Sequence, residues 1–217
     1  LTDALACAQE VIDSKRFEFM NDSINNVYAY RNLSYIEKMA RHEYVSSLYV
    51  YDLKEGRSDL FFKNLASCEC VIAEGRKASI YSGMGQDLDI RSKNWFETPA
   101  GSATEYVNKY MRGTQIPLLK LSEMYLIAAE ASGDIRYLET LRANRGYATD
   151  PLPAGANLQD EITKEYQKEF IAEGQLFYYY KRRNMAILPI TSTSMNRATY
   201  VLPVPDNELE FGNFKQN

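Results

Sequence analysis

The stretch from Ile116 to Ala131 (IPLLKLSEMYLIAAEA) constrains the fold more than any other part of the chain. Its apolar residues recur at helical spacing and cover most of the circumference, which is typical of a helix enclosed by neighbouring elements. Proline is common at the first position of a helix and glycine is common just after its end. Pro117 and Gly133 therefore predict a buried helix between them.

A second helix is expected immediately after this one. Asp134 is a suitable N-cap, and Ile135, Leu138 and Leu141 follow it on one helical face. Two helices joined by a short turn form a hairpin, which is the unit of tetratricopeptide-type arrays. The sequence therefore predicts a mainly α fold, with tetratricopeptide-like helix hairpins, irregular loops and a few short β-strands.

The longest predicted helix runs from Leu158 to about Arg183, after a proline- and glycine-containing loop. In this helix we place Glu165 on the solvent-facing side, within reach of Lys168 or Glu169. Further elements are predicted as a helix over residues 3–15 and strands over residues 43–53 and 105–111.

Composition excludes several classes of function. The 217 residues have 45% hydrophobic content, enough for the core of one domain spanning residues 1–217. A net charge of −4, with acids and bases mixed along the chain, argues against nucleic acid or an anionic membrane as a partner. Three cysteines give no disulfide framework, and with a single histidine they predict no metal site. No apolar run is long enough to span a membrane.

Four stretches together resemble the SusD/RagB family. They are IPLLKLSEMYLIAAEA, LETLRANRGY, EITKEYQKEFIAEGQLFYYYKRRN and TYVLPVPDNELEFGNFKQN, in the family's order and spacing. The segment DIRSKNWF, ahead of the first helix, resembles the family's DxRxxxxF pattern more weakly. Together these segments cover about the last 130 residues.

The resemblance implies a SusD-like fold and a place at the bacterial outer-membrane surface. Members of the family are lipoproteins of Bacteroidetes that bind a glycan or other nutrient without catalysis and hand it to a TonB-dependent SusC-like transporter. The expected partners are therefore an oligosaccharide or polysaccharide and that transporter. Family members are about twice this length, so we expect a domain truncated at its N-terminal side, with the lipid anchor outside this chain. The alternative is a helical protein–protein interaction scaffold that binds no glycan.

The family motifs do not carry ligand-binding residues, so these are predicted from chemistry. Sugar rings stack on aromatic side chains, and sugar hydroxyls bond to planar polar groups on loops. Trp95, Tyr81, Tyr28 and Tyr30 lie in irregular segments near such groups and are predicted to be ligand-binding. The alternative for each ring is packing in the core.

Four charged residues of the matched motifs are predicted to be structural. Arg142 and Arg145 lie one turn apart near a helix end, and Glu169 and Glu173 lie one turn apart on the long helix. We predict that one of these arginines pairs with one of these glutamates and fixes the hairpin to the long helix. The alternative is that all four side chains are solvated.

The sequence offers little for catalysis. Glycoside hydrolysis needs two carboxylates about 5–10 Å apart, and nothing near Asp87 and Asp89 suggests a tuned acid. The chain has no nucleophile elbow, phosphate-binding loop, dinucleotide fingerprint or zinc motif. We therefore predict no enzyme activity and no cofactor.

Overall fold

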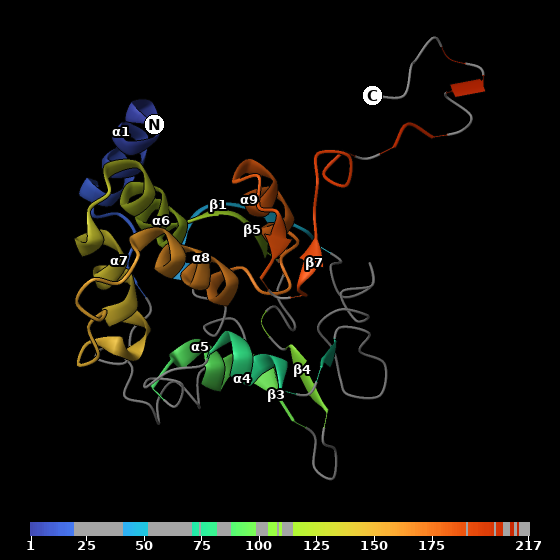
Figure 1. Ribbon diagram of the computed structural model, residues 1–217. Coiled ribbons are helices and arrows are strands. Elements are labelled where there is room, and N and C mark those ends of the chain that lie inside the picture. The colour runs from blue at the N-terminus through green and yellow to red at the C-terminus, as the bar shows by residue number, and fades with distance from the viewer. Residues whose placement is uncertain are drawn as a thin grey trace. The chain divides into compact units, whose positions relative to one another are not determined.

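The computed structural model divides the chain into two compact units, Leu1–Ala172 and Glu173–Asn217. It describes residues 1–19, 41–51, 71–73, 75–81, 88–98, 104–107, 109, 115–189, 191–201, 203–205, 209–210 and 212. The first unit contains α1 (Thr2–Asp13), η2 (Arg41–Glu43), β1 (Tyr44–Tyr49), β2 (Val71–Ile72), α4 (Arg76–Ile80), α5 (Ile90–Asn94), β3 (Phe96–Glu97), β4 (Glu105–Val107), β5 (Gln115–Lys120), α6 (Leu121–Ser132), α7 (Ile135–Arg142), η4 (Ala143–Tyr147) and α8 (Leu158–Glu169) (Figure 1). The second contains α9 (Leu176–Arg182), β6 (Ile187–Leu188) and β7 (Thr193–Ser194).

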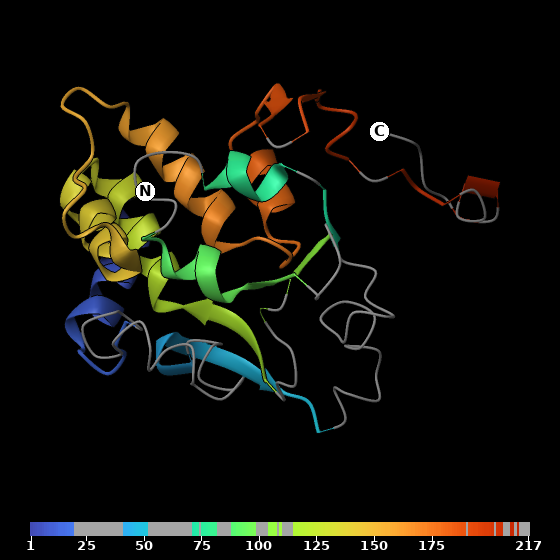
Figure 2. The same ribbon diagram turned by 90° about the horizontal axis from the view of Figure 1, so that it is seen from below.

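The helix hairpin is formed by α6 and α7. Gly133, in the left-handed conformation with φ of 72°, ends α6 as predicted. The Asp134 carboxylate caps α7 by accepting a hydrogen bond from the backbone N–H of Arg136. Helix α6 also contacts α1 and α8, so it is enclosed on several sides (Figures 1 and 2). The mainly α fold is confirmed.

The start of the first hairpin helix was predicted wrongly. Helix α6 begins at Leu121. Pro117 lies in β5, which pairs antiparallel with β1, and its partner across the two strands is Ser47. A strand of a two-stranded ribbon has an outer edge, and proline is tolerated there because it has no N–H to donate. Lys120, with extended backbone, is the residue at which the strand becomes a helix.

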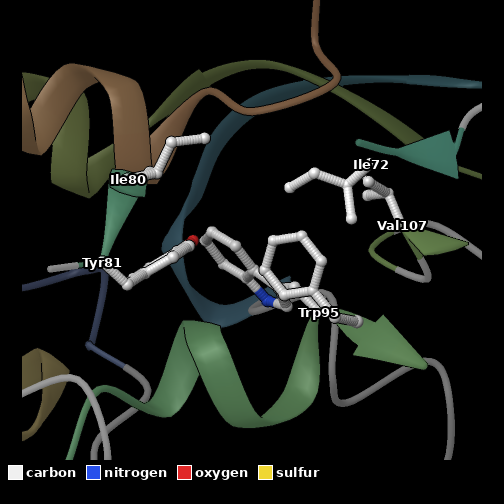
Figure 3. Close-up of a cluster of buried hydrophobic side chains, with 6 residues drawn as sticks. Ile72, Ile80, Tyr81, Trp95 and Val107 are labelled. Atoms are coloured by element: carbon white, nitrogen blue, oxygen red, sulfur yellow. The ribbon is translucent and has the colours of Figure 1, made fainter. Parts of the chain in front are cut away.

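Among the described residues, two clusters of buried apolar side chains contribute to the core of the first unit. In one, α1 packs on α6 through Ala8, Ile12, Leu121, Met124 and Ala128. The close contact is possible because alanines occupy the facing positions. The other cluster joins α4 and α5 to the antiparallel sheet of order β2-β4-β3 (Figure 3). Its members are Ile72, Ile80, Tyr81, Trp95, Phe96 and Val107.

The long helix predicted from Leu158 to about Arg183 is also wrong in extent. Helix α8 ends at Glu169, and α9 is a separate helix in the second unit. Between them Ala172 and Gly174 have φ of 60° and 73°, a left-handed conformation that interrupts an α-helix. No helix among the residues placed by the structure has the length and apolar character needed to cross a membrane.

The second unit is small and organised by aromatic rings. Phe177 of α9 packs against Tyr200, with ring centroids 5.7 Å apart. The Tyr200 hydroxyl donates a 2.8 Å hydrogen bond to the carbonyl of Met185, and β6 pairs antiparallel with β7.

Candidate functional site

Charged side chains are buried together inside the first unit. We call this set the buried charge cluster, and each member is at most 8% exposed. Its members are Glu43, Asp89, Arg91, Lys109, Lys120, Arg142, Arg145, Glu165, Lys168 and Glu169. They come from η2, β5, α7, η4, α8 and α5 with its N-cap, and Lys109 lies just after β4.

Glu169, the last residue of α8, lies between two guanidinium groups. Its Oε2 is 3.0 Å from Arg91 Nη1 and its Oε1 is 3.1 Å from Arg145 Nη2. Arg145 also binds both carboxylate oxygens of Glu43 at 2.7 Å. Arg145 and Glu169 are one of the arginine–glutamate combinations considered from the sequence. Through them the hairpin side of the molecule is joined to α8 and to the start of β1.

Glu165, one turn earlier on α8, was predicted to face solvent, and this is wrong. It is 1% exposed, and its carboxylate lies 2.8 Å from Arg91 Nη2 and 2.9 Å from Lys168 Nζ. Asp89 caps α5 and also binds the Arg91 guanidinium through both of its oxygens. Bidentate pairs of this kind are among the stronger polar contacts in proteins.

The carboxyl end of α8 is bound by side chains from distant parts of the chain. Lys109 and Lys120 both donate to the carbonyl oxygen of Glu169, and the Tyr81 hydroxyl donates to the carbonyl of Lys168. The last carbonyls of a helix have no partner within it and carry partial negative charge. These contacts satisfy them, so the helix can end in a buried position.

The electrostatics of the cluster favour charged carboxylates. Burial alone would raise the pKa of Glu165, but Lys168, Arg91 and Arg142 outweigh it and lower the pKa to about 2. Burial likewise opposes the charge of Glu169, and Arg145, Lys120, Arg91 and Lys109 hold its pKa well below the usual range. Both groups are ionised at neutral pH, so neither is suited to serve as a general acid there.

Acid is expected to weaken the first unit. A carboxyl group with a lowered folded-state pKa contributes stability above its unfolded pKa, and that contribution is lost as pH falls through the folded value. For Glu165 the loss runs from roughly pH 5 down to pH 2 and is of the order of 3 kcal/mol. Urea midpoints measured between pH 7 and pH 3 should therefore fall with pH. A constant midpoint over this range would contradict the depressed pKa values.

Two of the four predicted ligand-binding rings are buried in the structure. Trp95 is 3% exposed and Tyr81 is fully buried, and both rings belong to the cluster of apolar side chains between α4, α5 and the sheet (Figure 3). Lys109 Nζ lies 3.9 Å from the centre of a Trp95 ring. Their placement favours the packing alternative. Tyr28 and Tyr30 lie outside the described residues.

The remaining predicted ion-pair residues have other surroundings. Arg142 contacts Glu165, which lies one helical turn before the predicted Glu169. The distance from Arg142 Nη1 to Glu165 Oε1 is 3.3 Å. Glu173 belongs to the second unit, is half-buried and accepts a 3.4 Å hydrogen bond from Gln175 Nε2.

Exposed aromatic rings occur at the end of β1 and in the turn that follows it, where we had not predicted a ligand-binding site. Tyr49, the last residue of β1, is 66% exposed, and Tyr51 is 80% exposed. Gln115 of β5 is paired with Tyr49 across the ribbon. The spacing of two residues between the tyrosines was the available signal, because in extended backbone it places both side chains on one side. In the described part of the chain, no group of three or more His, Cys, Asp and Glu residues could hold a metal ion.

Comparisons with known proteins give one informative match. No protein-family model matches the chain, and no curated protein matches it. Its fold is similar to the crystal structure of a Bacteroides vulgatus protein named "putative sugar binding protein", with a TM-score of 0.69 and 22% sequence identity. The match covers 100% of this chain and 55% of the other, so the chain spans just over half of that structure. At this identity the likeness establishes the fold.

Proposed function

We propose that this chain belongs to a SusD-like protein that binds a glycan without cleaving it. The observation that supports this most is the likeness of the whole chain to the fold of a structure named for sugar binding. The four SusD/RagB-like motifs point in the same direction. On this proposal the protein lies at the outer-membrane surface and hands the glycan to a TonB-dependent transporter.

Within this proposal, Tyr49 and Tyr51 are the described residues best suited to contact a sugar. Their rings are exposed, they are two residues apart, and the Gln115 amide lies across the ribbon from Tyr49. Cross-strand partners lie on the same face, so a ring and a planar hydrogen-bonding group are side by side. Tyrosine presents a flat apolar face with a polar edge, which suits the C–H faces and hydroxyls of a sugar.

Replacing both tyrosines, Tyr49→Ala with Tyr51→Ala, is expected to weaken glycan binding by about 5-fold to 150-fold, since each ring contact contributes about 0.5–1.5 kcal/mol. The measurement is a polysaccharide screen by affinity electrophoresis, followed by calorimetric titration of the glycan that binds. Tyr178→Ala is the matched control, because Tyr178 is 71% exposed and lies on α9. Equal affinity of the double variant and the unchanged protein would remove these rings from the site.

The same ribbon exposes an apolar pair on its other face. Leu48 and Ile116 are directly paired across the strands and are 51% and 40% exposed. Exposed apolar side chains that lie together are typical of surfaces that contact another macromolecule. They support a protein partner, as in the transporter part of the proposal or in the alternative of a protein–protein scaffold. The glycan titration distinguishes the glycan-binding proposal from the scaffold alternative, because the scaffold alternative predicts no saturable binding of any glycan.

A further inference from the structure

A small hollow lies where α7 passes into η4 and the following loop. Its volume is about 210 Å³. Sites for drug-sized molecules typically measure ~300–1,000 Å³, so this one suits a single small ring or fragment. It is lined by Glu139, Arg142, Ala143, Tyr147, Ala148, Asp150 and Pro151.

Arg142 places a positive charge in the wall of the hollow, and some of its N–H groups make no hydrogen bond to the described part of the protein. The residue is 8% exposed, and its guanidinium carbon lies 4.4 Å from the centre of the Tyr147 ring. Its five N–H groups make two hydrogen bonds, to Glu165 Oε1 and to the Asp150 carbonyl, both at 3.3 Å. Charge-assisted bonds are usually ~2.7–2.9 Å, so these two are long. The guanidinium therefore has N–H groups left for an acceptor in the hollow.

The carboxylate that Arg142 contacts inside the protein is not bound by Arg142 alone. Glu165, the carboxylate nearest to Arg142, is shared with Arg91 and Lys168. Arg142 is therefore only partly neutralised by Glu165, and a ligand carboxylate placed against Arg142 would complete its charge-assisted contacts. Buried charges of one sign are costly when they are not compensated.

The rim of the hollow has a different character. Glu139 and Asp150 are half-buried, so solvent screens their repulsion of an anion held at Arg142. Ionised carboxylates only accept hydrogen bonds, and hydroxyl groups are suitable donors to them. Tyr147 and Pro151 add apolar surface to the lining.

We propose that this hollow binds a small hydroxylated carboxylate, such as a sugar acid, with its carboxylate on Arg142. The hydroxyl groups would donate to Glu139 and Asp150 at the rim. The inference relies on the proposed function only for taking a sugar as the carrier of the carboxylate. The site is separate from the exposed rings Tyr49 and Tyr51.

The first test compares sodium D-glucuronate with D-glucose, which differ at one carbon, in NMR titrations of the whole chain. We expect saturable binding of glucuronate and at least ~10-fold weaker binding of glucose, because one partner of a charge-assisted contact is missing in glucose. Equal affinities, or no saturable response to glucuronate, would overturn the proposal.

The second test uses variants. Ala148→Phe fills the hollow at an exposed position with helical backbone, leaves Arg142 in place, and should abolish glucuronate binding. Arg142→Gln should abolish it too. Arg136→Gln, the matched control on the same helix with a side chain 84% exposed, should bind as before. Unchanged glucuronate binding by folded Ala148→Phe would refute the assignment even if Arg142→Gln fails to fold. These variants keep Tyr49 and Tyr51, so polysaccharide binding remains a separate readout.

Discussion

The Glu169→Ala variant should lose about 3–5 kcal/mol of unfolding free energy, the usual cost of breaking a buried ion pair from one side. Glu169 is 1% exposed and lies between Arg91 and Arg145, with Lys120 Nζ 3.7 Å from its Oε1. Removal of this carboxylate leaves Arg91, Arg145 and Lys120 with less negative charge beside them, in an interior from which water is excluded. Glu43 and Asp89 would still bind the two arginines, which limits the loss.

Urea denaturation followed by fluorescence measures this loss directly. Trp95 is the single tryptophan, is 3% exposed and lies in the same unit, so its emission reports the unfolding of that unit. Glu161→Ala is the matched control on the same helix, because Glu161 pairs with the 58%-exposed Lys164. That pair should contribute less than ~1 kcal/mol. Similar losses in both variants would show that the contacts of Glu169 do not stabilise the fold as argued.

Gly146→Ala should destabilise the first unit by about 2–5 kcal/mol, through two effects that add. Gly146 has φ of 104°, a conformation that side chains rarely adopt. A Cβ atom would also lie 2.1 Å from the carbonyl oxygen of Leu88, which is backbone and cannot rotate away. The substitution would therefore push η4 away from the segment that leads into α5, and with it Arg145 and Asp89.

Gly133→Ala is the control that separates these two effects. Gly133 has φ of 72°, but a Cβ atom there would meet nothing within 4 Å. The Gly133→Ala variant should lose only the part of the unfolding free energy that comes from the left-handed backbone conformation, about 1–2 kcal/mol. If both alanine variants show the same drop in urea midpoint, the close approach of Gly146 to Leu88 is not what requires a glycine.

Local signals in the sequence predicted local features well. The apolar stripe of α6, its end at Gly133 and the cap of α7 at Asp134 each depend on residues a few positions apart. The first residue of α6 was missed because the apolar run continues unbroken from β5 into the helix. Pairing with β1 decides that Pro117 is extended, and β1 is about 70 residues away.

The errors at the candidate site have the same origin. Glu165 was placed in solvent because its neighbours in sequence are polar, yet Arg91, 74 positions earlier, makes its burial possible. Helix α8 was predicted to run on because its pattern continues, whereas the Tyr81 hydroxyl and two lysine side chains bind its last carbonyls. Trp95 and Tyr81 were considered for ligand contact because their flanking residues look like loops. Their burial depends on elements that are distant along the chain.

The long sequence separations within the buried charge cluster bear on how the chain folds. Arg145 meets Glu43 across 102 positions, and Arg91 meets Glu169 across 78. Contacts of such high order form only after large loops have closed, so these pairs are expected to assemble late and to slow folding. Until then the guanidinium and carboxylate groups stay hydrated. A partly folded molecule would accordingly expose ionic groups in the region that becomes the interior of the folded protein, which disfavours aggregation during its synthesis.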